Sequence, residues 1–149
     1  YLTTQLTELG IPVVVAINRF GTDYRLSHIV ETPAWGFESA HPFLNLCMLF
    51  PTDLSPEALL DELQAIEHGI SPASHRNPDG SYADRLIDID LVDVDRQVID
   101  TSRLRLPHPH LAERRFYLEP LAEIAPGYTH PVTGLTPLQM LSDLPAADE

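Results

Sequence analysis

Hydrophobic positions along the first half of the chain follow short strand-type runs and one helical pattern. Residues 11–17 and 43–50 are apolar and rich in strand-forming side chains, which predicts two buried strands, with a shorter extended segment at 26–30 between them. In residues 56–67 the aliphatic positions recur at helical spacing behind a Ser-Pro start, which predicts a helix. Prolines and glycines at 69–80 then predict a long loop.

The second half of the chain has the same mixed character. Residues 86–92 alternate acidic and aliphatic side chains as a half-buried strand does, and Asp95-Arg96 follows as a hairpin turn. Residues 116–118 predict a further strand, and a Thr-Pro pair at 136–137 predicts the start of a last short helix. Because strands and helices do not alternate regularly, we expect one α+β domain over residues 1–149, flexible at 145–149.

Composition excludes several classes of function. All nine basic residues are arginine, and with 22 acidic residues the net charge is -13, which argues against binding a nucleic acid or a membrane. The absence of lysine excludes a Schiff-base enzyme and a Walker phosphate loop. The single cysteine, Cys47, excludes a disulfide framework and fits the cytoplasm.

Two carboxylates on one strand face are the strongest candidate for chemistry. Asp88 and Asp90 are two residues apart, so a strand places both side chains about 7 Å apart on one face. Such a pair suits hard divalent ions that also bind phosphate oxygens. An ordinary amphipathic strand with its acidic face in water explains the same pattern, although the further acids Asp93 and Asp95 add a density of charge that favours a cation.

Two other constellations carry polar or aromatic side chains that bind ligands. In Leu-Pro-His-Pro-His, prolines flank His108, and Arg114 follows six residues later, a combination that suits phosphate oxygens. Solvent-exposed charges at a helix start are the plainer interpretation. Near Trp35, aromatic residues and the amide Asn45 suit a flat heterocycle, or simply a hydrophobic core.

Taken together, these motifs resemble one family, the 6-hydroxymethyl-7,8-dihydropterin pyrophosphokinases of folate biosynthesis, over roughly residues 27–141. The resemblance is carried, in order, by Thr32-Pro33 with Gly36, Asn45, Arg85 with Asp88 and Asp90, Leu106-Pro107-His108-Pro109, Arg114 with Phe116, and Glu119-Pro120 with Ala125-Pro126. It implies a ferredoxin-like α/β sandwich with a mostly antiparallel sheet. It also implies Mg²⁺-dependent transfer of pyrophosphate from ATP to 6-hydroxymethyl-7,8-dihydropterin, by a monomer.

The resemblance also implies roles for particular residues. It implies that Asp88 and Asp90 hold two Mg²⁺ ions and that Arg85 acts with them in catalysis. For ATP it implies contacts with Gln64, Glu67, Tyr82, Arg85, His108 and Arg114. For the pterin it implies a pocket of Thr32, Pro33, Trp35, Phe43, Asn45 and Phe116, in which Asn45 reads the ring edge and Phe116 stacks.

The N-terminal segment, residues 1–25, departs from this family. Its members open with a strand and a Gly-Ser-Asn-Leu-Gly loop, whereas residues 10–23 resemble a segment of formate–tetrahydrofolate ligase. Two other hypotheses stand beside an active enzyme, the first favoured by this departure and the second resting on the run of aspartates alone. One is a divergent family member that binds pterin or nucleotide without turnover, and the other is an acidic cation-binding interaction domain.

Overall fold

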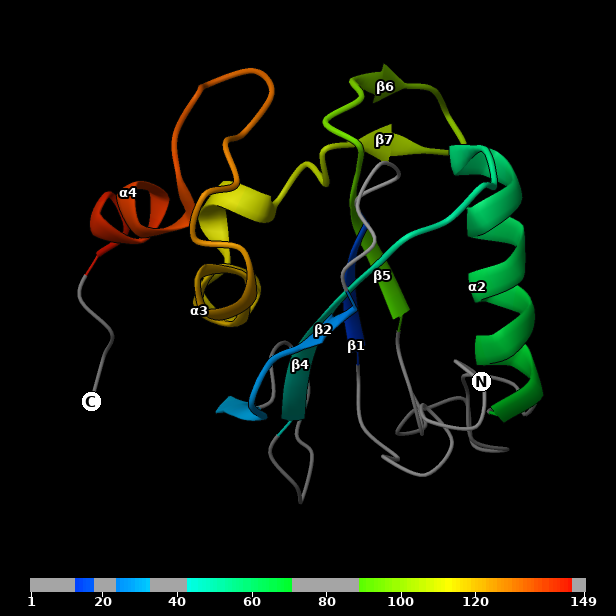
Figure 1. Cartoon of the computed structure of the whole chain (residues 1–149), viewed down its shortest axis with the longest axis horizontal. Helices are drawn as coiled ribbons and strands as arrows, with labels where there is room; N and C mark the ends of the chain where they lie inside the picture. Colours follow the sequence, from blue (N-terminus) through cyan, green and yellow to red (C-terminus); the bar gives the residue numbers. More distant parts are fainter. Residues whose placement is uncertain (1–12, 18–23, 33–42, 71–88, 146–149) are drawn as a thin grey trace, which may run out of the picture.

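A computed structural model of the chain describes residues 13–17, 24–32, 43–70 and 89–145 (Figure 1). The strands are β1 (Val13–Ile17), β2 (Arg25–Leu26), β3 (Val30–Thr32), β4 (Phe43–Phe50), β5 (Ile89–Val94), β6 (Ile99–Asp100) and β7 (Arg105–Leu106). The helices are α2 (Pro56–Ile70), the 3₁₀ turn η1 (Leu111–Glu113), α3 (Arg115–Ile124) and α4 (Pro137–Ser142).

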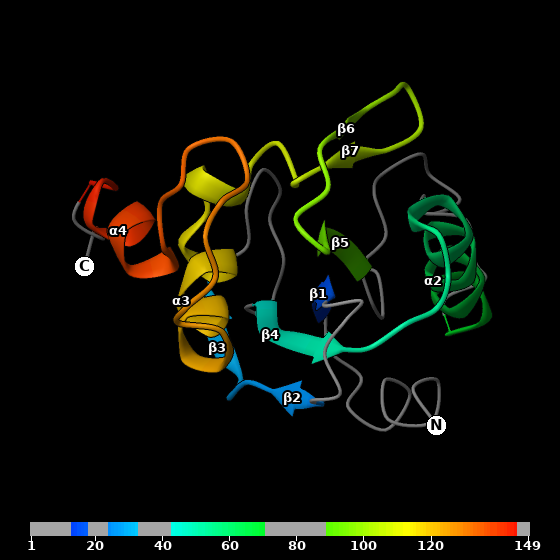
Figure 2. The same ribbon diagram turned by 45° about the horizontal axis from the view of Figure 1, so that its top comes forward.

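Helices cover both faces of the main sheet, with α2 on one side and α3 and α4 on the other (Figure 1, Figure 2). The alternation of side chains along β4 separates the two hydrophobic clusters. Leu46 and Met48 pack with α2, whereas Cys47 between them packs with α3. Cys47 is completely buried, in agreement with its interpretation as a small hydrophobic residue.

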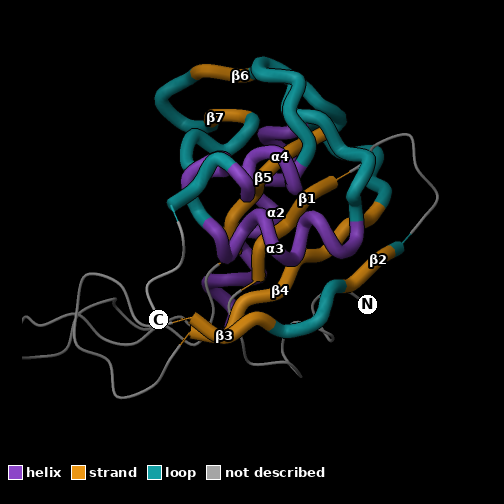
Figure 3. Tube along the Cα trace, turned by 90° about the vertical axis from the view of Figure 1, so that its left-hand side faces the viewer, coloured by secondary structure: helices purple, strands orange, loops and turns teal. Residues whose placement is uncertain are grey.

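The main sheet has the order β2-β4-β1-β5, with β3 also paired to β4. Strand β1 lies parallel to both β4 and β5, whereas β2 and β3 run antiparallel to β4, and β6 pairs antiparallel with β7. Antiparallel pairing thus accounts for three of the five described pairs. Figure 3 shows the small β6–β7 pair at one end of the main sheet. These elements confirm the predicted α+β class.

Both helix starts predicted from a cap and a proline are confirmed. The Ser55 hydroxyl accepts a hydrogen bond from the Ala58 N–H at 3.2 Å, and α2 begins at Pro56. At α4, Thr136 and Gln139 form a reciprocal capping box in which each side chain accepts from the other's backbone N–H. These local hydrogen bonds explain why the sequence fixes where the helices begin.

The predicted strand at residues 116–118 is wrong, because these residues form the first turns of α3. The run resembles a strand since it is short, aromatic and closed by Pro120. The longer pattern is helical: Tyr117, Leu118, Leu121 and Ile124 all lie on the face buried against the sheet. Burial of that face outweighs the backbone hydrogen bond lost at Pro120.

None of the helices within the described ranges has the length and apolar character needed to cross a bilayer.

Candidate functional site

Strand β5 brings Asp90 to the α3 side of the sheet. Ile89 and Leu91 pack with α2, whereas Val92 packs with α3, so the alternation directs Asp90 toward α3 as well. A shift of register against β1 follows: Val15 pairs with Leu91, and the next residue of β1 pairs with Asp93. This bulge adds Val92 to β5 without a partner on β1.

The Asp90 carboxylate meets a tyrosine hydroxyl that is bound in turn by an arginine. The Tyr117 hydroxyl donates to Oδ2 of Asp90 at 2.5 Å and accepts from Nη1 of Arg114 at 2.8 Å. Burial, followed by the neighbouring Asp90 charge, raises the pKa of Tyr117, which keeps its hydroxyl protonated at neutral pH. A carboxylate and a guanidinium from different segments therefore converge on one hydroxyl oxygen.

His108 joins this cluster from the segment that follows β7. Its backbone N–H donates to the Val92 carbonyl at 2.8 Å, and its ring meets Tyr117 edge-on at 5.1 Å between centroids. Burial, aided by the charge of Arg114, lowers the pKa of His108 to about 4. Nδ1 accepts from the His110 N–H at 3.1 Å, so the neutral ring carries its proton on Nε2. Nε2–H is thus a neutral hydrogen-bond donor.

Phe116 completes the described cluster. Its ring centroid lies 4.7 Å from that of Tyr117 and 5.6 Å from the Cζ of Arg114. The same guanidinium carbon lies 5.3 Å from the Tyr117 ring, so Arg114 rests against two aromatic residues. Stacking fixes the plane of the guanidinium and leaves its remaining N–H groups available to other acceptors.

Three predicted site residues lie elsewhere in the described structure. Gln64 is exposed on α2, and the Glu67 carboxylate accepts from the Ile89 backbone N–H at 3.0 Å. Glu67 therefore ties the end of α2 to the start of β5. Asn45 is buried on β4, and by alternation it shares the α3 face with Cys47. The sheet thus separates the cluster at α3 from α2.

The remaining predicted site residues lie wholly or partly outside the described residues. Thr32 and Phe43 belong to β3 and β4, but only their backbone is described. The others are Pro33, Trp35, Tyr82, Arg85 and Asp88. Of the predicted metal pair only Asp90 is described, and within the described ranges no three His, Cys, Asp or Glu side chains group to hold a metal ion.

Tyr117 is the member of the cluster that sequence reasoning missed. A signal is present in hindsight: Tyr117 follows Arg114 by three residues, the spacing of neighbours on a helix surface. Tyr117 is also completely buried, and a buried tyrosine hydroxyl needs a polar partner. The assignment of residues 116–118 to a strand concealed the helical spacing, and the burial of Tyr117 could be seen only in the structure.

The fold is that of a small α+β protein, and Arg114 and His108 in the cluster offer N–H donors that can bind an anion. In phosphoryl-transfer sites arginine binds phosphate oxygens and carboxylates hold the metal ions, and this cluster brings both residue types together. Comparison with known proteins makes the assignment specific. Residues 5–126 match the model of the 7,8-dihydro-6-hydroxymethylpterin-pyrophosphokinase (HPPK) family.

Individual relatives agree with this match. The chain is 40% identical over 114 residues to the 2-amino-4-hydroxy-6-hydroxymethyldihydropteridine pyrophosphokinase of Porphyromonas gingivalis, covering 76% of each chain. It is 36% identical over 108 residues to the enzyme of that name from Aquifex aeolicus, covering 72% of this chain and 65% of that protein. It is also 36% identical over 114 residues to the folic acid synthesis protein fol1 of Pneumocystis carinii, covering 75% of this chain and 15% of that protein.

The chain therefore belongs to the HPPK family, and it is an ATP-dependent pyrophosphokinase of folate biosynthesis. The resemblance of residues 10–23 to formate–tetrahydrofolate ligase is not borne out, because the family match runs through this segment.

Proposed function

We propose that the chain transfers the terminal pyrophosphate of ATP to the hydroxymethyl group of 6-hydroxymethyl-7,8-dihydropterin. The names of its relatives support this choice of acceptor. In the reaction the acceptor oxygen bonds to the β-phosphorus, the bond from that phosphorus to the α-phosphate oxygen breaks, and AMP leaves. The observation that carries the proposal is the convergence of Asp90, Arg114 and His108 from three separate segments.

We assign the metal site to Asp88 and Asp90, with two Mg²⁺ ions. The donor set fits, because Mg²⁺ prefers oxygen ligands, commonly one or two carboxylates together with substrate phosphates. Asp90 is only partly buried, and Tyr117 is bonded to just one of its carboxylate oxygens. When bound, the ions neutralise charge on the triphosphate.

Arg114 and His108 are the proposed phosphate ligands, together with Arg85. Beyond its bond to Tyr117, the Arg114 guanidinium has further N–H donors for phosphate oxygens. The His108 imidazole is neutral at pH 7 and offers Nε2–H as a donor. The same proposal gives Gln64, Glu67 and Tyr82 to the nucleotide. Gln64 and Glu67 lie on α2, across the sheet from Arg114, and Glu67 is connected to the site through its hydrogen bond to Ile89, the residue before Asp90.

The pterin pocket is proposed on the α3 face of the sheet. Asn45 is buried on that face and supplies the amide that would read the ring edge, and Phe116 supplies the stacking surface. Thr32, Pro33, Trp35 and Phe43 complete the proposed pocket. We further propose a monomer that acts in the cytoplasm and binds neither nucleic acid nor membrane.

A nucleotide assay tests this function. With Mg²⁺, ATP and the hydroxymethyl-dihydropterin, AMP and pterin diphosphate should form in equal amounts. Asp88→Ala or Asp90→Ala should abolish turnover with an unchanged circular dichroism spectrum, because these carboxylates position ions rather than pack the core. Asp143→Ala removes an exposed carboxylate at the end of α4 and is the matched control. Formation of ADP, or wild-type turnover in both Asp variants, would refute the assignment.

A further inference from the structure

Tyr117 lies between two opposite charges that do not touch each other. Its hydroxyl oxygen is 2.8 Å from Nη1 of Arg114 and 2.5 Å from Oδ2 of Asp90. Among the ion pairs of the described residues, none joins Arg114 directly to Asp90. A neutral group thus occupies the position at which the guanidinium and the carboxylate would otherwise meet.

The surrounding packing holds that hydroxyl in place. Tyr117 is completely buried, and its ring packs edge-on against His108 and Phe116 at centroid distances of 5.1 and 4.7 Å. Arg114 and Asp90, in contrast, are only partly buried. Of Asp90, Arg114 and Tyr117, the neutral tyrosine is therefore the most completely buried.

Without the hydroxyl, the two charges have a strong alternative to binding a ligand. Arginine and carboxylate side chains form short, bidentate ion pairs when their geometry allows. Such a pair would occupy the carboxylate oxygens that a cation needs and the N–H donors that a phosphate needs. A hydroxyl that donates to one partner and accepts from the other satisfies both at a single point and leaves their other atoms available.

We propose that Tyr117 is a positioning residue that keeps Arg114 and Asp90 from pairing with each other, so that Asp90 remains available to a divalent cation and Arg114 to phosphate. This inference rests on the proposed function for the identity of the two ligands. It concerns the ground state of the free protein, in which the charges are already separated before any ligand arrives.

Tyr117→Phe removes the hydroxyl that lies between Arg114 and Asp90, here called the spacer, and keeps the buried ring. Tyr128→Phe is the matched control, because Tyr128 also donates to an aspartate of the same strand, Asp93, at 2.7 Å and outside this cluster. Binding of Mn²⁺ alone is followed by electron paramagnetic resonance, and binding of Mg²⁺ with α,β-methylene-ATP by calorimetry. Tyr117→Phe should weaken both by about 10-fold, and Tyr128→Phe should change neither.

A second variant separates this role from a merely structural one. With Arg114→Met there is no cation to pair with Asp90, so adding Tyr117→Phe should then change the Mn²⁺ affinity by less than about 2-fold. Equal Mn²⁺ affinity in wild-type protein and Tyr117→Phe would overturn the inference. So would a loss that is the same with and without the Arg114→Met substitution, since a general loosening of the site would be additive.

Failure of the role proposed for Tyr117 can be distinguished from failure of the proposed function. If wild-type protein releases AMP while Tyr117→Phe binds Mn²⁺ normally, the function stands and the spacer role fails. If no AMP forms but Mn²⁺ binding still depends on Tyr117 only when Arg114 is present, the spacer role stands and the proposed reaction fails.

Discussion

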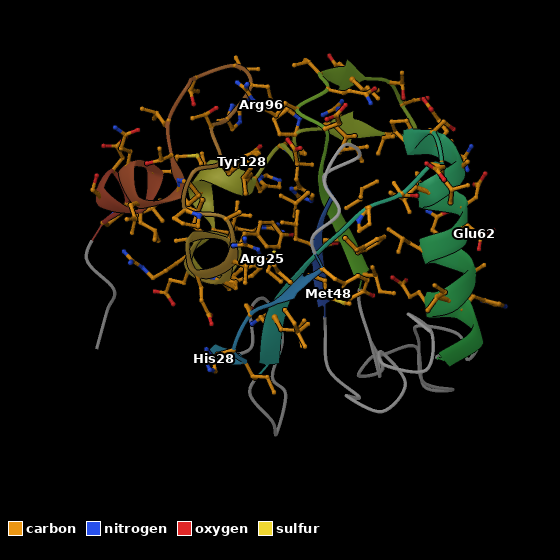
Figure 4. All side chains as sticks on the ribbon, in the orientation of Figure 1. Arg25, His28, Met48, Glu62, Arg96 and Tyr128 are labelled. Atoms are coloured by element: carbon orange, nitrogen blue, oxygen red, sulfur yellow. The ribbon has the colours of Figure 1, made fainter. Side chains whose placement is uncertain are left out.

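Two aspartates of strand β5 each accept a hydrogen bond from a tyrosine hydroxyl, but the two tyrosine–aspartate pairs have different surroundings. In the first pair Tyr117 donates to Asp90 at 2.5 Å, and in the second Tyr128 donates to Asp93 at 2.7 Å. Each pair has an arginine and a histidine nearby. Arg114 and His108 accompany the first pair, whereas Arg96 and His130 accompany the second. Figure 4 labels Arg96 and Tyr128 of the second pair.

In the second pair, protein groups donate hydrogen bonds to both carboxylate oxygens of the aspartate. Asp93 is 3% exposed, and its other oxygen, Oδ1, accepts from the Arg96 backbone N–H at 2.9 Å. The Arg96 side chain is used as well, because its Nε donates to the Thr129 carbonyl. At His130, Nδ1 accepts from the N–H groups of Val132 and Thr133. The Tyr128–Asp93 and Arg96–Thr129 bonds connect β5 and the turn after it to the segment that follows α3.

In the first pair, the charged groups have hydrogen-bonding atoms that no described protein group uses, which is here called unused capacity. Asp90 is partly buried, and among the described residues only Tyr117 donates to its carboxylate. Arg114 uses one terminal nitrogen for the tyrosine and stacks on aromatic rings. The comparison teaches that residue types alone do not separate a structural carboxylate from a candidate ligand. The deciding property is whether the protein itself satisfies every oxygen.

The sharpest way to break this comparison is to remove one charge from each pair. Asp90→Asn should lower kcat/KM by about 10³-fold, because the altered group no longer binds a cation well, while stability changes little. Asp93→Asn should do the reverse. Its NH₂ group would face a donor that needs an acceptor, costing about 1–3 kcal/mol of unfolding free energy, while turnover per folded molecule is kept.

Urea unfolding and the AMP assay measure both quantities on each variant. If Asp93→Asn lowers kcat in the folded protein as much as Asp90→Asn does, the two pairs do not divide structure from function. A stability loss in Asp90→Asn that matches Asp93→Asn would contradict the idea that Asp90 has unused capacity.

Local signals were sufficient to predict much of the fold. The helix start at Ser55-Pro56 and the turn at Asp95-Arg96 depend on hydrogen bonds over two or three residues, and both are confirmed. Both turn residues have positive φ, 55° and 57°, as a tight two-residue turn requires. The predicted hairpin is wrong, because among the described strands β5 pairs with β1 and β6 pairs with β7 rather than with β5. Strand β4 has the bounds predicted from its apolar run. Strand direction was not predictable in this way, since pairing depends on segments far apart in the sequence.

The sequence predicted Asp90, His108, Arg114 and Phe116 as site residues through the family motif, and the structure brings these four together. It did not predict the two tyrosine partners, because Tyr117 lies 27 residues from Asp90 and Tyr128 lies 35 residues from Asp93. The β5 bulge also hides the second pair, since simple alternation would not direct both Val92 and Asp93 toward the α3 side.

The two pairs should also differ in how they affect stability with pH. His108, beside the first pair, has a folded-state pKa of about 4, below its ordinary 6.5, so its contribution is complete above pH 6.5 and is lost as pH falls toward 4. Burial raises the pKa of Asp93 above its ordinary 3.8. Its contribution therefore has the opposite sign, complete below pH 3.8 and lost as pH rises through the raised value.

Unfolding free energy measured from pH 3 to pH 8 separates these contributions. His108→Asn should remove about 1–2 kcal/mol of the loss on acidification, a figure reduced for the partial exposure of the ring. A smaller loss of the same sign should remain, because burial also lowers the pKa of His130. Asp93→Asn should instead remove the decline that begins as pH rises above 3.8. A His108→Asn profile parallel to that of wild-type protein would show that the ring is not held neutral in the folded state.

The smallest expected effect is local and sharpens the comparison at the second pair. Tyr128→Phe removes one hydrogen bond to Asp93 and should cost about 1 kcal/mol, with unchanged kcat and KM. Because Tyr128 and Arg96 join the segment after α3 to the turn after β5, the loss should appear first as faster amide hydrogen exchange at Gln97 and Tyr128, whose N–H groups bond to Val94 and Ala125. Exchange should be unchanged at Ala58, whose N–H bonds to Ser55 at the start of α2 on the other side of the sheet. Equal acceleration at all three amides would mean that the pair stabilises the whole fold rather than fastening these two segments.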